Sequence, residues 1–258
     1  ALFIAGVLPG LLLGGSLCAY CLYAARKNNF PKGRRIPLGE ALRICGDALW
    51  GLMTMFIILG GILSGVFTAT ESASIAVLWA FFVTMFVYRD YKWNDLPKLM
   101  HRTVKTVCIV MILIGFAAAF GYIMTLMMIP LKITAAMTAM SDNRYVILAM
   151  INLMLLALGT LMDMAPLILI LTPILLPVIK SIGIDPVHFG MIMMVNLGIG
   201  LITPPVGAVL FVGSAVAKLR IEQVVQAMWP FFVILFSVLI LVTYVPAISL
   251  WLPGLFGV

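Results

Sequence analysis

Apolar residues run for about twenty positions at a time along this chain, the length that an α-helix needs to cross a bilayer. Short polar segments separate the runs. The pattern predicts membrane-spanning helices at about 2–24, 41–64, 67–88, 104–128 and 223–251. The expected fold class is therefore an all-α polytopic membrane protein.

A first interrupted region lies in the second half of the chain. Two apolar runs, Tyr145–Leu158 and Leu167–Ile179, are too short to cross a bilayer, and the polar segment Gly159–Pro166 joins them. Two half-length helices that meet at a polar tip predict a re-entrant hairpin at about 145–180. A pair of kinked helices with an ordinary turn is the alternative.

A second interruption falls inside the apolar run at about 188–217. The run contains the adjacent prolines Pro204 and Pro205. Each proline removes an amide donor and clashes with the preceding helical turn, so carbonyls upstream lose their partners. Broken helices of this kind form the ion and substrate sites of secondary transporters. The break therefore predicts a membrane transporter. Its polar, small and cyclic residues are Asn196, Gly198, Gly200, Thr203, Pro204 and Pro205.

Composition supports the membrane class. The sequence is 64% hydrophobic and only 10% charged, which lies outside the range of soluble globular proteins. The formal net charge of +7 is also found in nucleic-acid-binding proteins. Basic residues beside apolar runs, however, commonly follow the positive-inside rule, so we expect no nucleic acid as a partner.

The basic residues give an orientation. If the segment 26–35 is cytoplasmic, thirteen of the 16 Lys and Arg fall on the cytoplasmic side. Only Lys132, Arg144 and Lys180 then fall outside, an asymmetry that agrees with the positive-inside rule and predicts an outside C-terminus. The thirteen are Arg26, Lys27, Lys32, Arg34, Arg35, Arg43, Arg89, Lys92, Lys98, Arg102, Lys105, Lys218 and Arg220.

The sequence lacks the usual signals for catalysis. It has no nucleophile paired with a base and no Gly-rich phosphate loop with its Lys. His188 has no second His, Cys or carboxylate at ligand spacing, so we expect no transition-metal site. Cys18 and Cys21 have the spacing of a redox pair but lie in an apolar run, where they are interpreted as small helix residues. We expect neither enzyme activity nor a cofactor.

Two acidic residues lie in or beside apolar runs, where a carboxylate costs about 2.5–3.5 kcal/mol at the bilayer centre. Asp163 is expected at the hairpin tip, as a cation ligand, as a gate for substrate, or as the cap of the second half-helix. Glu71 follows Thr68 and Thr70 at the start of a predicted span. A role in substrate binding or coupling and a role as a helix cap are equally compatible with that position.

The two interruptions together offer a cation site. A hard cation prefers oxygen ligands, and freed carbonyls, the Thr203 hydroxyl and the Asn196 amide oxygen supply them with little negative charge. The half-helix N-termini near Ala165 and Val206 are expected to present free amides to a carboxylate. The predicted ligands therefore suit a weakly held hard cation, and the helix ends suit a carboxylate.

Three stretches, GGILSGVFTATESASIAV, GTLMDMAPLILILTPILLPVIKSIGIDPVHFG and NLGIGLITPPVGAVLF, carry a resemblance that covers essentially the whole chain. They resemble the C-terminal part of the large membrane subunit of tripartite ATP-independent periplasmic (TRAP) transporters. One departure is Ala69, where the family often has a proline between two threonines. The resemblance implies a bacterial inner-membrane symporter that is driven by sodium and imports an organic acid. It further implies a periplasmic binding protein and a small membrane subunit as partners.

The same resemblance implies an elevator-type architecture, of which this chain holds the second inverted repeat. Residues 1–102 would be scaffold-type helices, 103–222 the transport-domain repeat and 223–258 a C-terminal helix. Because the first repeat is not in this sequence, we expect a piece of a longer subunit. By resemblance, the sodium ligands would be Gly159, Thr160, Asp163, Asn196, Gly200, Thr203 and Pro204.

A function of another class stays open from the residues alone. A proton-coupled antiporter or an ion channel subunit would use Asp163 and Glu71 as a relay. A channel, however, commonly shows a repeated pore-lining segment, and none is visible in the sequence.

Overall fold

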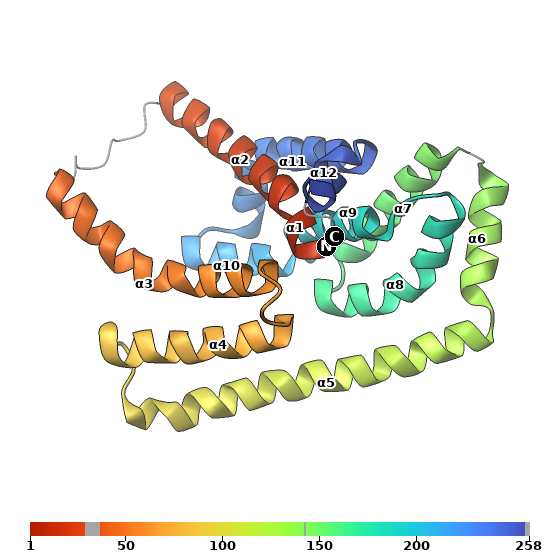
Figure 1. Cartoon of the computed structure of the whole chain (residues 1–258). Helices are drawn as coiled ribbons and strands as arrows, with labels where there is room; N and C mark the ends of the chain where they lie inside the picture. Colours follow the sequence, from red (N-terminus) through yellow and green to blue (C-terminus); the bar gives the residue numbers. More distant parts are fainter. Residues whose placement is uncertain (29–36, 142, 256–258) are drawn as a thin grey trace. The chain divides into compact units, whose positions relative to one another are not determined.

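The computed structural model describes residues 1–28, 37–141 and 143–255 (Figure 1). Over these ranges the chain forms α-helices, a π-helical turn at Val83–Val87 and a 3-10 turn at Trp93–Asp95, without any strand. Six helical segments are long and apolar enough to cross a membrane. The predicted all-α polytopic fold is therefore confirmed.

The five predicted spans all appear as helices. Of the basic residues assigned to the cytoplasmic side, Lys32, Arg34 and Arg35 lie outside the described residues. The helices are α1 (Leu2–Ala5) with α2 (Val7–Lys27), α3 (Leu38–Leu63), α4 (Ala69–Phe82), α5 (Leu96–Leu126) and α11 (Ile221–Tyr244).

The last two of these helices differ from the prediction at one end. The prediction for α5 was wrong at its start, since the helix begins at Leu96 and accommodates Pro97 in its first turn. The prediction for α11 was wrong at its end, because the helix stops at Tyr244 and a separate α12 (Ala247–Leu255) follows. Val245 precedes Pro246, and a residue before proline avoids the helical conformation.

A short helix that the apolar pattern did not predict follows α5. Met128 adopts a left-handed conformation with φ of 52°, which ends one helix and starts α6 (Ile129–Met140). The proline at position 130 lies in the first turn of α6, where its missing amide donor does no harm. Helix α6 packs against α8 (Met164–Ser181).

The chain divides into two compact units, which we describe separately. The discontinuous unit holds residues 1–29 and 110–258, and the α3–α4 unit holds residues 30–109. The chain passes from one unit to the other within α5. The division at 102 and 222 that the resemblance implies concerns which parts move, and it stays a prediction.

The α3–α4 unit is a helical hairpin with polar contacts near its turn. Ser72 is fully buried and its hydroxyl donates to the carbonyls of Ile57 and Ile58 at 3.2 and 3.1 Å. At the other end, the rings of Trp50 and Trp79 stack with centroids 5.7 Å apart, and the Trp79 indole donates to the Trp50 carbonyl. Hydrogen bonds between the two helices and aromatic packing thus hold this hairpin together.

The discontinuous unit has a core built around α9 (Pro186–Gly200). Most residues of this helix are apolar and buried, as expected of a helix at the centre of a core. It packs against α1, α7 (Arg144–Gly159), α8, α11 and α12. Fully buried residues from three helices form its densest part: Ile151, Leu155, Leu175, Ile179, Ile192 and Leu197. The central helix of this unit is therefore the first half of the predicted broken helix.

Candidate functional site

The predicted hairpin consists of α7, the four-residue tip Thr160–Asp163 and α8. Its polar interruption is shorter than predicted, because α7 continues through Gly159 and α8 already begins at Met164. Pro166 lies in the first turn of α8, which tolerates proline. Helix α8 has 18 residues and is long enough to cross a membrane, so the expectation that it is too short was wrong. Re-entry of the hairpin into the membrane stays a prediction.

The predicted break in the second helix is present. Helix α9 ends at Gly200, an irregular segment Leu201–Gly207 follows, and α10 (Ala208–Ala217) continues the chain. Gly207 has φ of 50°, and a Cβ there would lie 3.1 Å from the Thr203 carbonyl oxygen. Glycine is therefore required where the chain re-enters a helix.

The carbonyls that the two prolines leave without helical donors find other partners. The Gly200 carbonyl accepts the Thr203 amide at 3.0 Å, and the Leu201 carbonyl accepts the Val209 amide at 3.2 Å. The prediction that these carbonyls lose their partners was therefore wrong in part, because each oxygen accepts one hydrogen bond. A carbonyl oxygen has two lone pairs, so each can still contribute to a cation site.

The hairpin tip and the break touch each other through their backbones. A Cβ on Gly200 would lie 2.7 Å from the Gly159 carbonyl carbon, a distance at which only glycine fits. Beyond this contact, the Gly207 amide donates to the Thr160 carbonyl at 3.3 Å. Both interruptions that the sequence predicts therefore meet at one place in the discontinuous unit.

Two threonine hydroxyls flank this contact. The Thr160 hydroxyl donates to the Ala157 carbonyl at 2.8 Å, and the Thr203 hydroxyl donates to the Ile199 carbonyl at 2.7 Å. Each hydroxyl thus donates its single hydrogen to a carbonyl of the preceding helix, and the lone pairs of its oxygen stay available. This arrangement suits oxygen ligation of a cation.

Asn196 is fully buried one helical turn before Gly200. Its side-chain nitrogen donates to the backbone carbonyl of Asn152 at 2.9 Å and to the Asn152 side-chain oxygen at 2.7 Å. Sequence reasoning did not single out Asn152. Its position within the apolar run of α7 could have indicated it, because an amide buried there requires polar partners.

The remaining predicted residues of the tip and break are exposed. The Asp163 carboxylate caps α8 by accepting the Met164 amide at 2.8 Å, so the capping interpretation is confirmed. Ala165 lies in the first turn of α8, whereas Pro204 and Val206 lie in the break before α10. Roles of these residues toward a cation or a carboxylate stay predictions.

The third predicted group lies in the α3–α4 unit. Thr68 and Glu71 form a complete capping box at the start of α4, in which the Glu71 carboxylate accepts the Thr68 amide at 2.8 Å. The Thr70 hydroxyl lies 3.2 Å from that of Thr68. The capping alternative is therefore confirmed for this group. A role in substrate binding or coupling stays a prediction.

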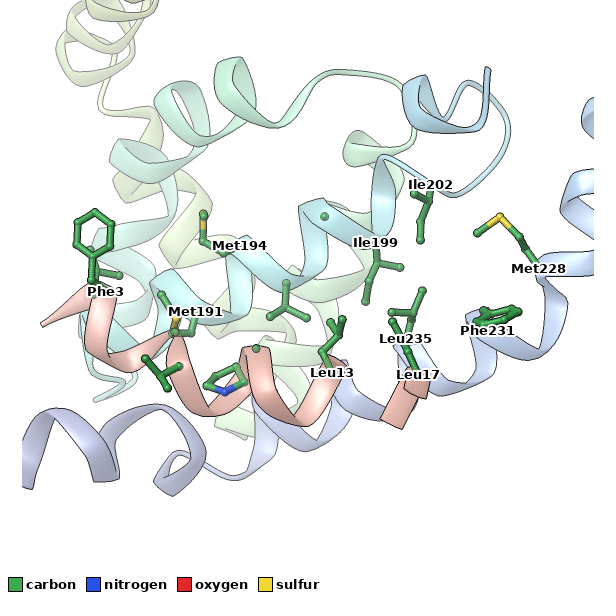
Figure 2. A pocket seen from close by; sticks show the side chains of 17 residues that line it. Phe3, Leu13, Leu17, Met191, Met194, Ile199, Ile202, Met228, Phe231 and Leu235 are labelled. Carbon is green, nitrogen blue, oxygen red and sulfur yellow. The ribbon is translucent and has the colours of Figure 1, made fainter. Parts of the chain in front are cut away.

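A large cavity of the discontinuous unit lies elsewhere. It is a groove of about 750 Å³ between α2, α9 and α11, and all of its lining residues are apolar. Figure 2 shows Leu13 and Leu17 of α2 close to Leu235 and Phe231 of α11. Because the groove is lined by apolar side chains and offers no polar or charged side chain to a cation or a carboxylate, we place the candidate site at the tip-to-break contact instead.

No cluster of His, Cys, Asp or Glu that could hold a metal ion occurs among the described residues. His188 is buried, and one of its ring nitrogens lies 3.2 Å from the Thr243 carbonyl oxygen. This histidine is therefore a packed core residue with a backbone partner.

Comparison with known proteins gives a consistent match. Residues 1–248 match the family described as tripartite ATP-independent periplasmic transporter, DctM component. The C4-dicarboxylate TRAP transporter large permease protein DctM of Pseudomonas aeruginosa is 44% identical over 99% of this chain and 60% of its own length.

Two other relatives have different names. The isethionate TRAP transporter permease protein DctMQ of Oleidesulfovibrio alaskensis is 41% identical over 98% of this chain and 40% of its own length. The sialic acid TRAP transporter large permease protein SiaM of Vibrio cholerae is 37% identical over 99% and 60%, respectively. Relatives named as large permease proteins are thus matched over about 60% of their length.

Proposed function

Because the chain belongs to the DctM-component family of tripartite ATP-independent periplasmic transporters, we propose that it is part of a sodium-coupled importer of an organic acid. It would act in the bacterial inner membrane together with a small membrane subunit. A periplasmic binding protein would deliver the substrate.

One observation carries this proposal. The tip of the hairpin and the break of α9 share a backbone contact at Gly159 and Gly200 and a hydrogen bond between Gly207 and Thr160. A packed transmembrane scaffold gains nothing from two costly interruptions, whereas a transporter uses them to expose carbonyls and helix ends to its ligands.

The chemistry of the contact supports a sodium ion. The candidate ligands are neutral oxygens: the hydroxyls of Thr160 and Thr203, carbonyls of Gly159 and Gly200, and the amide of Asn196. The carboxylate of Asp163 at the tip is the one charged candidate among them. Hard cations prefer such oxygens, and few negative charges leave the ion weakly held. Weak binding suits an ion that must be released in every cycle.

The substrate class follows from the relatives. Their names specify C4-dicarboxylate, isethionate and sialic acid, all of which are small organic anions. The N-termini of α8 and α10 would present the positive end of the helix dipole to such an anion, while the amides of Met164, Gly207 and Val209 already donate within the protein. We propose that elevator-like movement of the hairpin with the broken helix carries ion and anion together.

The test is uptake by the full-length subunit, reconstituted in proteoliposomes with its small subunit and binding protein. Labelled C4-dicarboxylate, isethionate and sialic acid are offered in turn, with an inward gradient of either sodium or protons. We expect uptake of one substrate class that requires both sodium and the binding protein. Uptake driven by protons alone, or without any binding protein, would overturn the proposal and favour a relay through Asp163 and Glu71.

A further inference from the structure

Hydrogen bonds link four polar residues across the apolar interior of the discontinuous unit. Asn196 donates to Asn152, as described above, and the Asn152 side-chain nitrogen donates to the Thr243 hydroxyl oxygen at 3.0 Å. The carbonyl of Thr243 lies 3.2 Å from Nε2 of His188. We call these four residues the polar chain. It connects α7, α9 and α11.

Two backbone carbonyls fix the direction of every bond in the polar chain. The Asn152 carbonyl can only accept, so the nitrogen of the Asn196 amide must face it. Asn152 must then turn its own oxygen toward Asn196 and its nitrogen toward Thr243. The Thr243 carbonyl likewise requires that His188 carries its hydrogen on Nε2. A flip of the Asn196 amide would place its oxygen against two acceptors, and a flip of the Asn152 amide would place two donors against each other.

This orientation turns the Asn196 oxygen away from Asn152. Within the described part of the chain, that oxygen is buried and has no hydrogen-bond partner. Buried polar atoms in native proteins nearly always have a partner, so an unpaired one requires an explanation. Gly200, four residues further along α9, lies at the tip-to-break contact, about 6 Å away by helix rise.

From this geometry we infer that Asn152 and Thr243 are positioning residues for cation binding. They hold the Asn196 amide so that its oxygen is presented to the ion, and neither of them needs to touch the ion. In metal sites generally, residues behind the ligands fix ligand orientation and raise affinity. The inference rests on the proposed function, because it assumes that the transported ion is a cation bound near the break.

Thr243 offers a matched pair of variants. Thr243→Val keeps nearly the same volume but removes the oxygen that accepts from Asn152, whereas Thr243→Ser keeps that oxygen. Both are made in the full-length subunit, and uptake is measured in proteoliposomes over a series of sodium chloride concentrations. We expect Thr243→Val to raise the half-saturating sodium concentration about threefold to tenfold, the range for losing one neutral hydrogen bond.

Maximal uptake at saturating sodium should stay close to that of the unchanged subunit, since the ligands themselves are retained. Thr243→Ser should restore the original sodium dependence. A purely structural role predicts lower stability and lower maximal uptake with an unchanged half-saturation, and this result would overturn the inference. If Thr243→Val does not fold, Thr243→Cys replaces it, because a thiol is only a weak acceptor.

The two proposals fail in different ways. If uptake by the unchanged subunit does not depend on sodium, the proposed function fails and the inference fails with it. If the unchanged subunit depends on sodium and Thr243→Val has the same half-saturation, only the positioning role is wrong. The sodium-dependent shift of the thermal unfolding midpoint in detergent measures the same half-saturation without any transport step, and it should change in parallel.

Discussion

The chain contains two helical hairpins whose turns look alike in sequence but differ in their tertiary contacts. The α3–α4 turn and the α7–α8 tip each contain a threonine and lead into a helix whose N-terminus is capped by an acidic side chain. The caps at Glu71 and Asp163 both form as local rules require. The α7–α8 tip also touches a second backbone interruption, at Gly200 and Gly207. The two turns therefore share their capping chemistry, and the α7–α8 tip adds a tertiary backbone contact to it.

The largest effect is expected from the glycine contact. A Cβ on Gly200 meets backbone atoms of Gly159 at 2.7 and 2.8 Å, so Gly200→Ala must push α7 and α9 apart. Overpacking a core typically costs about 1–3 kcal/mol, and fixed backbone atoms place this variant at the upper end. We expect near-complete loss of uptake and a lower thermal unfolding midpoint in detergent.

Gly61→Ala is the matched control in the other hairpin. Its Cβ would lie 2.9 Å from the Phe67 ring and from the Ser72 hydroxyl, which are side-chain atoms and can move. We expect a clearly smaller loss of stability and retained uptake. Equal losses for the two variants would show that the tip-to-break contact has no special role.

The contrast between the hairpins also shows how far the sequence predicts the molecule. Apolar length and capping residues predict the spans, the Asp163 and Glu71 caps and the break near Pro204, because these depend on neighbouring residues. The pairing of Asn152 with Asn196 depends on two helices meeting, and no local pattern contains it. Helix α6 was missed because a left-handed Met128 is unusual for a side chain of this size.

The second expected effect compares the two acidic caps. Asp163→Asn keeps a good N-cap, and Glu71→Gln keeps the capping box, so neither variant should unfold. If only Asp163 contributes to cation binding, its loss of charge should raise the half-saturating sodium concentration roughly 10- to 100-fold, as expected for losing one interaction with a charged group. Glu71→Gln should change it less than about twofold, since a neutral capping box keeps the local structure.

Sodium-dependent uptake over a concentration series measures both variants, with protein amount in the membrane as the control. An equal shift for Glu71→Gln would instead support the predicted coupling role of Glu71. Wild-type behaviour of Asp163→Asn would reduce Asp163 to a helix cap and remove it from the proposed ligands.

The smallest effect is a difference in labelling rate between the two turns. Leu161 at the α7–α8 tip and Val66 in the α3–α4 turn are both well exposed, at 56% and 68%. Each is changed to cysteine in a full-length subunit from which the exposed Cys18, Cys21, Cys45 and Cys108 have been removed.

A ligand can shift a conformational equilibrium only if it binds the two states with different affinity. If sodium and substrate act on the α7–α8 tip, they should change the rate at which Leu161→Cys reacts with an impermeant thiol reagent, by about threefold or more for a shift of even 0.7 kcal/mol. Val66→Cys should react at one rate under all conditions, because no ligand is proposed to contact its turn. The reaction is followed by gel shift with and without each ligand. Equal rates at Leu161→Cys in every condition would mean that the tip does not move with the ligands, and the two hairpins would then be equivalent in motion as they are in local sequence.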